Sequence, residues 1–157
     1  MKKQIIADIL PDNESSTSIW LDLEALADVE ITSEESDHPI EAALLPNRGH
    51  GWRAGKPGTQ TIRLLFKLPQ NIHKIQLGFM ESAVTRTQEY VLRWSKDHGQ
   101  TFQEIVRQQW NFNPDGSTTE MEEHALALAD VTVLELVITP DIGSQGALAS
   151  LEKLRIA

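Results

Sequence analysis

The sequence predicts an all-β fold, an antiparallel β-sandwich or jelly roll. Roughly seven or eight short apolar segments recur along the chain, Gly and Pro turns separate them, and no long segment has the apolar periodicity of a helix. The length of 157 residues suits one domain. We expect that domain to span residues 1–157, with residues 1–28 as an N-terminal extension packed on it.

The first elements are short. Ile19–Leu23 alternates more and less apolar residues, as a half-buried strand does. Val29 and Ile31 begin a second strand. Ile40–Leu45 suits a single helical turn, which Pro46 stops because proline has no amide hydrogen and cannot continue a helix.

Two further strands are predicted on either side of a turn. Ile62–Phe66 and Ile72–Phe79 carry apolar residues at strand spacing, and Pro69–Asn71 between them has the composition of a turn. A segment with four glycines, residues 47–58, precedes these strands and permits tight backbone paths.

The clearest local structure is a hairpin between Glu89 and Gln108. Tyr90, Leu92 and Trp94 fall on one face of an extended chain, which we expect to face the core. Residues 95–100 supply a turn, because they contain an aspartate that can bond the local backbone and a glycine free to take a positive φ.

The last third of the chain is predicted to be strand as well. A Pro-Asp-Gly turn at residues 114–116 ends the strand that carries Trp110. Residues 119–130 contain many helix formers but lie between strands, and we favour strand there. Residues 131–138 are nearly all apolar and rich in β-branched side chains, and residues 151–156 form the closing strand.

The order of several short segments resembles the discoidin domain, also called the coagulation factor type C domain, among the galactose-binding-like jelly rolls. The segments are Val29–Glu34, Gly51-Trp52-Arg53 with the strand at 61–66, Ile72–Leu77, Tyr90–Phe102 with its Asp97-His98-Gly99 turn, and Ala149–Ile156. The resemblance covers roughly residues 29–157. It implies a galactose-binding-like jelly roll that holds its ligands in the loops at one end.

The sequence departs from this family at its structural calcium site. Glu41–Asn47 replaces the family's acidic segment, and Lys153 takes the place of an acidic residue on the closing strand. Calcium needs several oxygen ligands. We therefore expect no metal and no cofactor.

The candidate ligand contacts lie in the loops. Trp52 would offer an aromatic ring to the apolar face of a sugar, and Arg53 a fork of hydrogen-bond donors. Arg86 is the one cation of the loop at residues 80–88, which the resemblance places beside the loop at residues 32–39. The full candidate set is Trp52, Arg53, Arg86, Trp110, His38 and His50.

Each candidate also has a structural alternative. Trp52 can plug one end of the sandwich, Arg53 and Arg86 can pair with nearby carboxylates, and Trp110 suits the core as well as an exposed position. The loop at residues 80–88 is polar overall, which disfavours lipid binding.

Composition excludes several classes of function. The net charge of −9 disfavours nucleic acid and membrane surfaces as partners. We see no signal peptide and no cysteine, and we expect a cytoplasmic protein. The five histidines are scattered, with no His-x-His, and no nucleophile or phosphate-binding motif occurs, so we do not expect an enzyme.

The sequence therefore favours a non-catalytic binding module for a carbohydrate or a similar polyhydroxylated ligand at the loop end of the sandwich. The alternative is a module for protein–protein interaction or assembly that uses the same fold. The expected partner is accordingly a carbohydrate or a protein.

Overall fold

Two long, bent strands organise the fold. The computed structural model describes residues 20–157. Strand β3 (Gln60–Met80) and strand β6 (Thr119–Thr139) pair antiparallel along most of their length. Their register shifts between Leu65 and Lys74, so both strands bend there and pass from one layer of the sandwich to the other.

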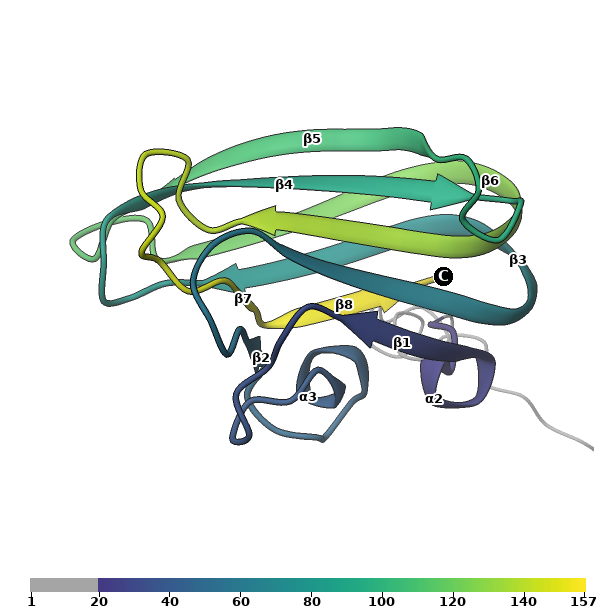
Figure 1. The fold of residues 1–157 in the computed structure, drawn as a ribbon, viewed down its shortest axis with the longest axis horizontal. Helices are drawn as coiled ribbons and strands as arrows, with labels where there is room; N and C mark the ends of the chain where they lie inside the picture. The colour runs from purple at the N-terminus through teal and green to yellow at the C-terminus, as the bar shows by residue number, and fades with distance from the viewer. Residues whose placement is uncertain (1–19) are drawn as a thin grey trace, which may run out of the picture.

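The bends divide the strands into two layers, which Figure 1 shows. The first half of β3 pairs with β1 (Ala27–Ile31) and with the second half of β6, which continues to β4 (Arg86–Ser95) and β5 (Gln103–Phe112). The second half of β3 pairs with β8 (Lys153–Ile156) and with the first half of β6. The predicted antiparallel β-sandwich is therefore confirmed.

The remaining elements are short. They are the helical turns α2 (Leu23–Leu26) and α3 (Glu41–Leu44), and a two-stranded ladder of β2 (Trp52–Arg53) with β7 (Ser150–Leu151). The helical turn predicted before Pro46 is confirmed by α3. No helix within residues 20–157 is long and apolar enough to cross a membrane.

The strand predicted at Ile19–Leu23 is wrong. Leu23 instead begins α2, because the Asp22 carboxylate accepts a hydrogen bond from the backbone N–H of Ala25 at 3.4 Å and caps the turn. An alternation this short also fits one helical turn with one buried side chain, here Leu23. Ile19 lies outside the described residues.

The turn predicted at Pro69–Asn71 is also wrong, because the chain bends within β3 and does not reverse there. Proline is tolerated at this point because the ladder to β6 is interrupted between Leu65 and Gln70. The strand predicted at residues 119–130 is confirmed. Pairing with β3 overrides the helix-forming composition of that segment.

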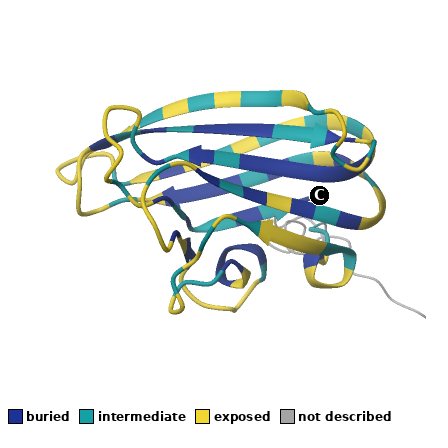
Figure 2. Ribbon diagram, viewed as in Figure 1, coloured by how far each residue is buried: buried dark blue, intermediate teal, exposed yellow. Residues whose placement is uncertain are grey.

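The core lies between the two layers, and Figure 2 shows buried residues alternating with exposed ones along the strands. Strand β4 contributes Tyr90 and Leu92, and the Tyr90 ring stacks on Phe79 of β3 with 5.2 Å between ring centres. Trp94 is half-buried and packs against the same core. The predicted inward face of the hairpin is thus confirmed.

The outer face of the five-stranded layer carries a row of alternating charges, one from each strand. Direct cross-strand pairing places these residues in the order Glu30, Arg63, Glu135, Arg93 and Glu104. Glu135 has no exposed surface, because Arg63 and Arg93 cover it from either side. Its carboxylate accepts from Arg63 Nε at 2.6 Å and from Arg93 Nε at 2.8 Å.

Candidate functional site

The loops at one end of the sandwich enclose a cavity of about 540 Å³, which we call the loop-end cavity. Its walls come from the end of β3, the loop that leads to β4, and the loop between β6 and β7. The backbone ties these parts together, since Ile142 N–H donates to Thr87 O at 2.9 Å. The lining residues are Arg53, Met80, Glu81, Ala83, Val84, Thr85, Arg86, Asp141, Ser144, Gly146, Ala147, Leu148 and Ser150.

A smaller hollow of about 290 Å³ lies next to the loop-end cavity. Arg53 and Glu81 line both. His38 and His50 line the smaller hollow only, so the loop at residues 32–39 does lie beside the loop after β3, as the resemblance implies.

Trp52 is part of the core at this end, with 1% of its surface exposed. Its indole Nε1–H donates to the backbone oxygen of Ser33 at 3.0 Å. A buried ring with a satisfied N–H cannot serve as an exposed platform for a sugar. Trp52 therefore has the structural role that the sequence left open, that of closing the end of the sandwich.

Arg53 is the accessible cation of the site. Its backbone is fixed, since its N–H donates to His38 O at 3.2 Å and its carbonyl accepts from Glu35 N–H at 2.9 Å. Its side chain is exposed and makes no ion pair or hydrogen bond within residues 20–157. A guanidinium held at the junction of the two hollows is available to an incoming carboxylate or hydroxyl group.

Arg86 has a different position, since it is 3% exposed. Its Nε donates to Glu81 at 2.8 Å, its Nη1 donates to the backbone oxygen of Pro140 at 2.6 Å, and its guanidinium lies 4.9 Å from the centre of the Phe112 ring. These contacts fix Arg86 as a wall of the loop-end cavity. The guanidinium is therefore not a free ligand donor.

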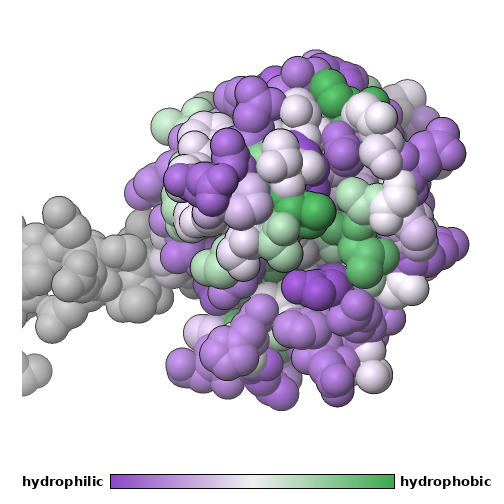
Figure 3. All heavy atoms as spheres, turned by 90° about the vertical axis from the view of Figure 1, so that its left-hand side faces the viewer, coloured by the Kyte–Doolittle hydropathy of each residue, from purple (hydrophilic) through white to green (hydrophobic). Residues whose placement is uncertain are grey.

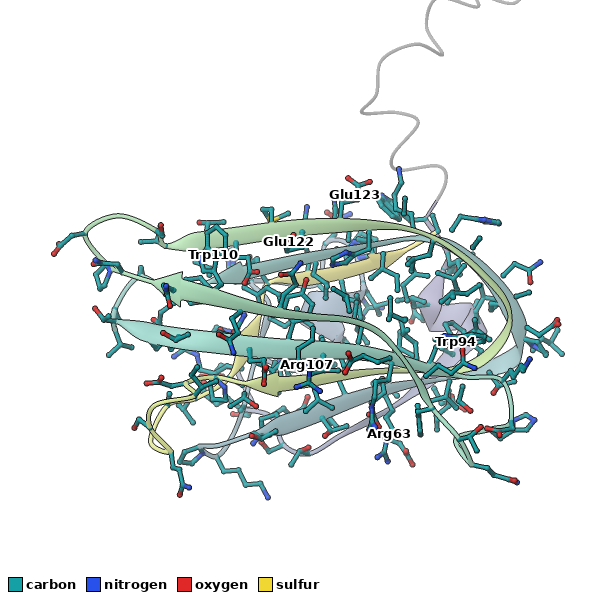
Figure 4. The ribbon with its side chains drawn as sticks, turned by 90° about the horizontal axis from the view of Figure 1, so that it is seen from above. Arg63, Trp94, Arg107, Trp110, Glu122 and Glu123 are labelled. Carbon is teal, nitrogen blue, oxygen red and sulfur yellow. The ribbon has the colours of Figure 1, made fainter. Side chains whose placement is uncertain are left out.

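Trp110 is separated from the other candidates. It lies on β5 opposite Gln88 of β4, is half-buried, and lines neither hollow. Figure 4 shows its side chain in the space between β5 and the first half of β6, near Glu122. The structure thus brings five of the six candidates to one end, with Arg53, His38 and His50 accessible among them.

The sequence analysis missed the apolar side chains of the site. Met80, Val84 and Leu148 line the loop-end cavity and are 50%, 54% and 37% exposed. Figure 3 looks onto this end and shows apolar side chains gathered within a polar surround. The expectation of a polar loop is corrected here, because Val84 lies in a mostly polar segment of the sequence and joins Leu148, from a distant segment, only in the fold.

A cluster of buried polar side chains, Gln88 and Glu120, lies inside the sandwich beside Arg86. Gln88 Nε2 donates to Glu120 Oε1 at 3.3 Å, and Glu120 is 1% exposed. Burial, together with the charge of Glu122, raises the pKa of Glu120 to about 7. Burial also raises the pKa of Tyr90, whose hydroxyl lies 2.9 Å from His124 Nε2, and the nearby Glu122 and Glu120 add to the rise.

In this chain a lysine and apolar residues lie where the discoidin family has its calcium site. Lys153 lines a cavity of about 740 Å³ together with Leu44, Leu45 and Pro46. Within residues 20–157, no group of three or more His, Asp or Glu residues is placed to hold a metal ion.

Comparison of the sequence with models of known protein families identifies the family of this chain. The family model described as the XRCC1 N terminal domain matches residues 23–129, well over half of the chain. The chain belongs to the XRCC1 N-terminal domain family. No curated protein matches the chain in sequence.

Solved structures of carbohydrate-binding modules have the same fold. CpGH89CBM32-5 from Clostridium perfringens, in complex with GalNAc-β-1,3-galactose, matches with a TM-score of 0.64 and 20% identity over 87% of this chain and 98% of that one. The family 32 module of C. perfringens NanJ, in complex with galactose, matches at 0.62 and 14% over 87% and 96%. A pectin-binding module matches at 0.61 and 14% over 83% and 89%.

At these identities the likeness concerns the fold alone. It confirms the galactose-binding-like jelly roll predicted from the sequence. The carbohydrate-binding modules and this member of the XRCC1 N-terminal domain family share one fold.

Proposed function

We propose that this chain is a non-catalytic protein-interaction module that binds a segment of a partner protein at the loop end. One observation carries the proposal: exposed apolar side chains gather around a cavity whose rim holds the unpaired Arg53. Apolar patches of this kind, surrounded by polar residues, mark interaction sites. Membership of the XRCC1 N-terminal domain family supports the same class of function.

The charges at the cavity favour a carboxylate on the partner. Arg86 neutralises Glu81, and Asp141 Oδ1 already accepts from the backbone N–H groups of Thr87 at 3.4 Å and Gly143 at 3.0 Å. Arg53 forms no ion pair with Asp141 or with any other carboxylate within residues 20–157. The matching segment presents an apolar side chain to Met80, Val84 and Leu148 and a carboxylate to Arg53.

The aromatic residues favour a protein over a sugar. The chain has four Trp, one Tyr and four Phe, all within residues 20–157, and none of them lines the loop-end cavity. A sugar site would use an exposed ring to cover the apolar face of its ligand. Aliphatic side chains suit apolar side chains of a protein segment.

Selection of displayed random peptides on the full chain tests the proposal. We expect enriched peptides to combine an apolar residue with Asp, Glu or a free C-terminal carboxylate. Val84→Asp places a charge in the apolar patch, and we expect it to weaken binding of these peptides about tenfold or more in fluorescence anisotropy, because burying an unpaired charge is unfavourable.

Leu68→Asp is the matched control. Leu68 is 70% exposed, lies at the bend of β3 and lines neither hollow, so its substitution should leave peptide affinity unchanged. Enrichment of no peptide, or equal loss of binding in both variants, would contradict the proposal.

A carbohydrate is the second candidate, favoured by the polar lining of the smaller hollow. His38, His50, Arg53, Ser150 and Glu152 place hydrogen-bond donors and acceptors around one space, as a polyhydroxylated ligand requires. A glycan array probed with the wild type and with His50→Ala tests this candidate. A saturable signal that His50→Ala reduces would support carbohydrate binding, and no signal for any glycan would exclude it for the glycans tested.

A further inference from the structure

The cavity of about 740 Å³ that Lys153 lines, which we call the helical-turn cavity, is separate from the loop end. Residues 20–23, which lead into α2, residues 44–46, which follow α3, and strands β3 and β8 enclose it. Figure 1 shows both helical turns on the same side of β8. The cavity shares no lining residue with the loop-end cavity, so a ligand bound here would be independent of the proposed function.

The helical-turn cavity has apolar walls and a polar, positively charged floor. Lys153 and Arg155 are two residues apart on β8, so both side chains lie on the same face of that strand. Gln76 of β3 is the direct cross-strand neighbour of Arg155 on this face. The volume lies within the range of about 300 to 1,000 Å³ usual for small-molecule sites. The apolar side chains of the walls are Trp20, Leu21, Leu23, Leu44, Leu45 and Pro46.

The charges of the cavity do not compensate each other. Its one acidic residue, Asp22, caps α2 by accepting from the backbone N–H of Ala25 at 3.4 Å. Within residues 20–157, neither Lys153 nor Arg155 forms an ion pair with any carboxylate. A positively charged cavity therefore lies in a protein whose net charge is −9.

The guanidinium of Arg155 is held in place with one side left open. Its Nη1 donates to the backbone oxygens of Ala43 at 2.7 Å and Leu154 at 3.0 Å. Its Nε and Nη2 make no hydrogen bond within the part of the chain that the structure describes. Burial lowers the pKa of Arg155, because a charged guanidinium loses favourable contact with water. An anion at Nε and Nη2 would compensate for that loss, since these two groups match the two oxygens of a carboxylate.

We propose that the helical-turn cavity binds a small organic carboxylate with an apolar body. Arg155 holds the carboxylate through Nε and Nη2, Lys153 adds a second positive charge, and the apolar walls cover the body of the ligand. A neutral apolar ligand would leave the open side of Arg155 without a partner. An inorganic anion would leave the apolar walls in water, so the two halves of the cavity together select this class of ligand.

Naphthalene-2-carboxylate is a suitable probe, and its uncharged amide is the matched control ligand. We expect calorimetric titration of the full chain to give saturable binding of the carboxylate, and binding of the amide weaker by about tenfold or more, because the amide lacks the charge that the two cations bind. In an NMR titration the carboxylate should shift the indole N–H signal of Trp20, assigned by its loss in Trp20→Phe. The signal of Trp110, which does not line the cavity, should stay in place.

Lys153→Met removes one cation, keeps the length of the side chain, and breaks no hydrogen bond or ion pair within residues 20–157. We expect it to weaken binding of the carboxylate about fivefold or more while leaving binding of the amide unchanged. Lys96→Met is the matched control, since Lys96 is exposed in the hairpin turn and does not line the cavity. Val84→Asp, which tests the loop end, should also leave this binding unchanged.

Three results would overturn the inference. They are no saturable binding of the carboxylate to the full chain, equal affinities for the carboxylate and the amide, and equal effects of Lys153→Met and Lys96→Met. The first of these would leave residues 1–19, which directly precede Trp20, as the remaining candidate occupant of the cavity.

Discussion

The folded protein is expected to lose stability as the pH rises from 4.5 to about 7, because of Glu120. Burial keeps the Glu120 carboxyl protonated in the folded state up to about pH 7, whereas its ordinary pKa is 4.5. Below pH 4.5 both states hold the proton. Between the two values only the folded state holds it, so unfolding releases a proton and rising pH favours unfolding.

The size of this effect follows from the difference between the two pKa values. It corresponds to roughly 3 kcal/mol of unfolding free energy, present in full below pH 4.5 and lost by a pH somewhat above 7. Urea unfolding at a series of pH values measures it. The urea midpoint should fall across this window while the dependence on urea concentration stays constant.

Glu120→Gln resembles the protonated form and can still accept from Gln88. We expect the variant to show a much flatter dependence on pH in the same window and to be the more stable protein at pH 8. Glu123→Gln is the matched control, since Glu123 is exposed on the opposite face of the same strand and pairs with Lys74 at 3.1 Å. If Glu120→Gln keeps the wild-type pH profile, Glu120 is not the group responsible.

Removing both arginines that cover Glu135 is expected to destabilise the protein by about 3 kcal/mol or more. Arg63→Met with Arg93→Met preserves the apolar stems but leaves the Glu135 carboxylate, which has no exposed surface, without a counter-charge. Glu135→Gln removes the carboxylate charge and leaves both arginines in place. We expect it to lower the free energy of unfolding by less, about 1 to 2 kcal/mol. The arginine side chains are 44% and 40% exposed and can bind water when their partner is lost.

Arg107→Met provides the comparison for this experiment. Arg107 pairs with Glu104 at 3.0 Å and Glu89 at 3.4 Å on the same face, but its side chain is 53% exposed. We expect Arg107→Met to lower the free energy of unfolding far less than the double arginine change does, because solvent screens exposed ion pairs. A double arginine variant no less stable than Glu135→Gln would show that the buried carboxylate does not need its two covering cations.

The local sequence pattern was sufficient to predict the hairpin and the helical turn α3. Tyr90, Leu92 and Trp94 alternate strictly, and the Asp97-His98-Gly99 turn has the required chemistry, with φ near +61° at His98 and +89° at Gly99. Local pattern was insufficient where a strand bends. Nothing between Leu65 and Ile72 distinguishes a bend within β3 from a turn, because the difference depends on pairing with β6.

Some features of the candidate site were likewise predictable from the sequence, and others were not. The sequence was sufficient to predict that Arg53, His38 and His50 lie in loops at one end of the sandwich, where polar residues are accessible. It did not distinguish Arg53 from Arg86, since pairing with Glu81 and burial against Phe112 depend on three-dimensional contacts. Nor did it identify Val84 and Leu148 as one surface, because they are far apart in the chain.

The sequence by itself determined the fold class, the resemblance to galactose-binding-like jelly rolls and the end of the sandwich at which a ligand binds in that family. These depend on alternation and turn chemistry within short segments, which are local properties. Only the tertiary structure decided which side chains are buried, paired or free at that end. It buried Trp52, paired Arg86 and left Arg53 beside an apolar cavity, because burial and charge pairing depend on neighbours that the chain brings together from distant segments.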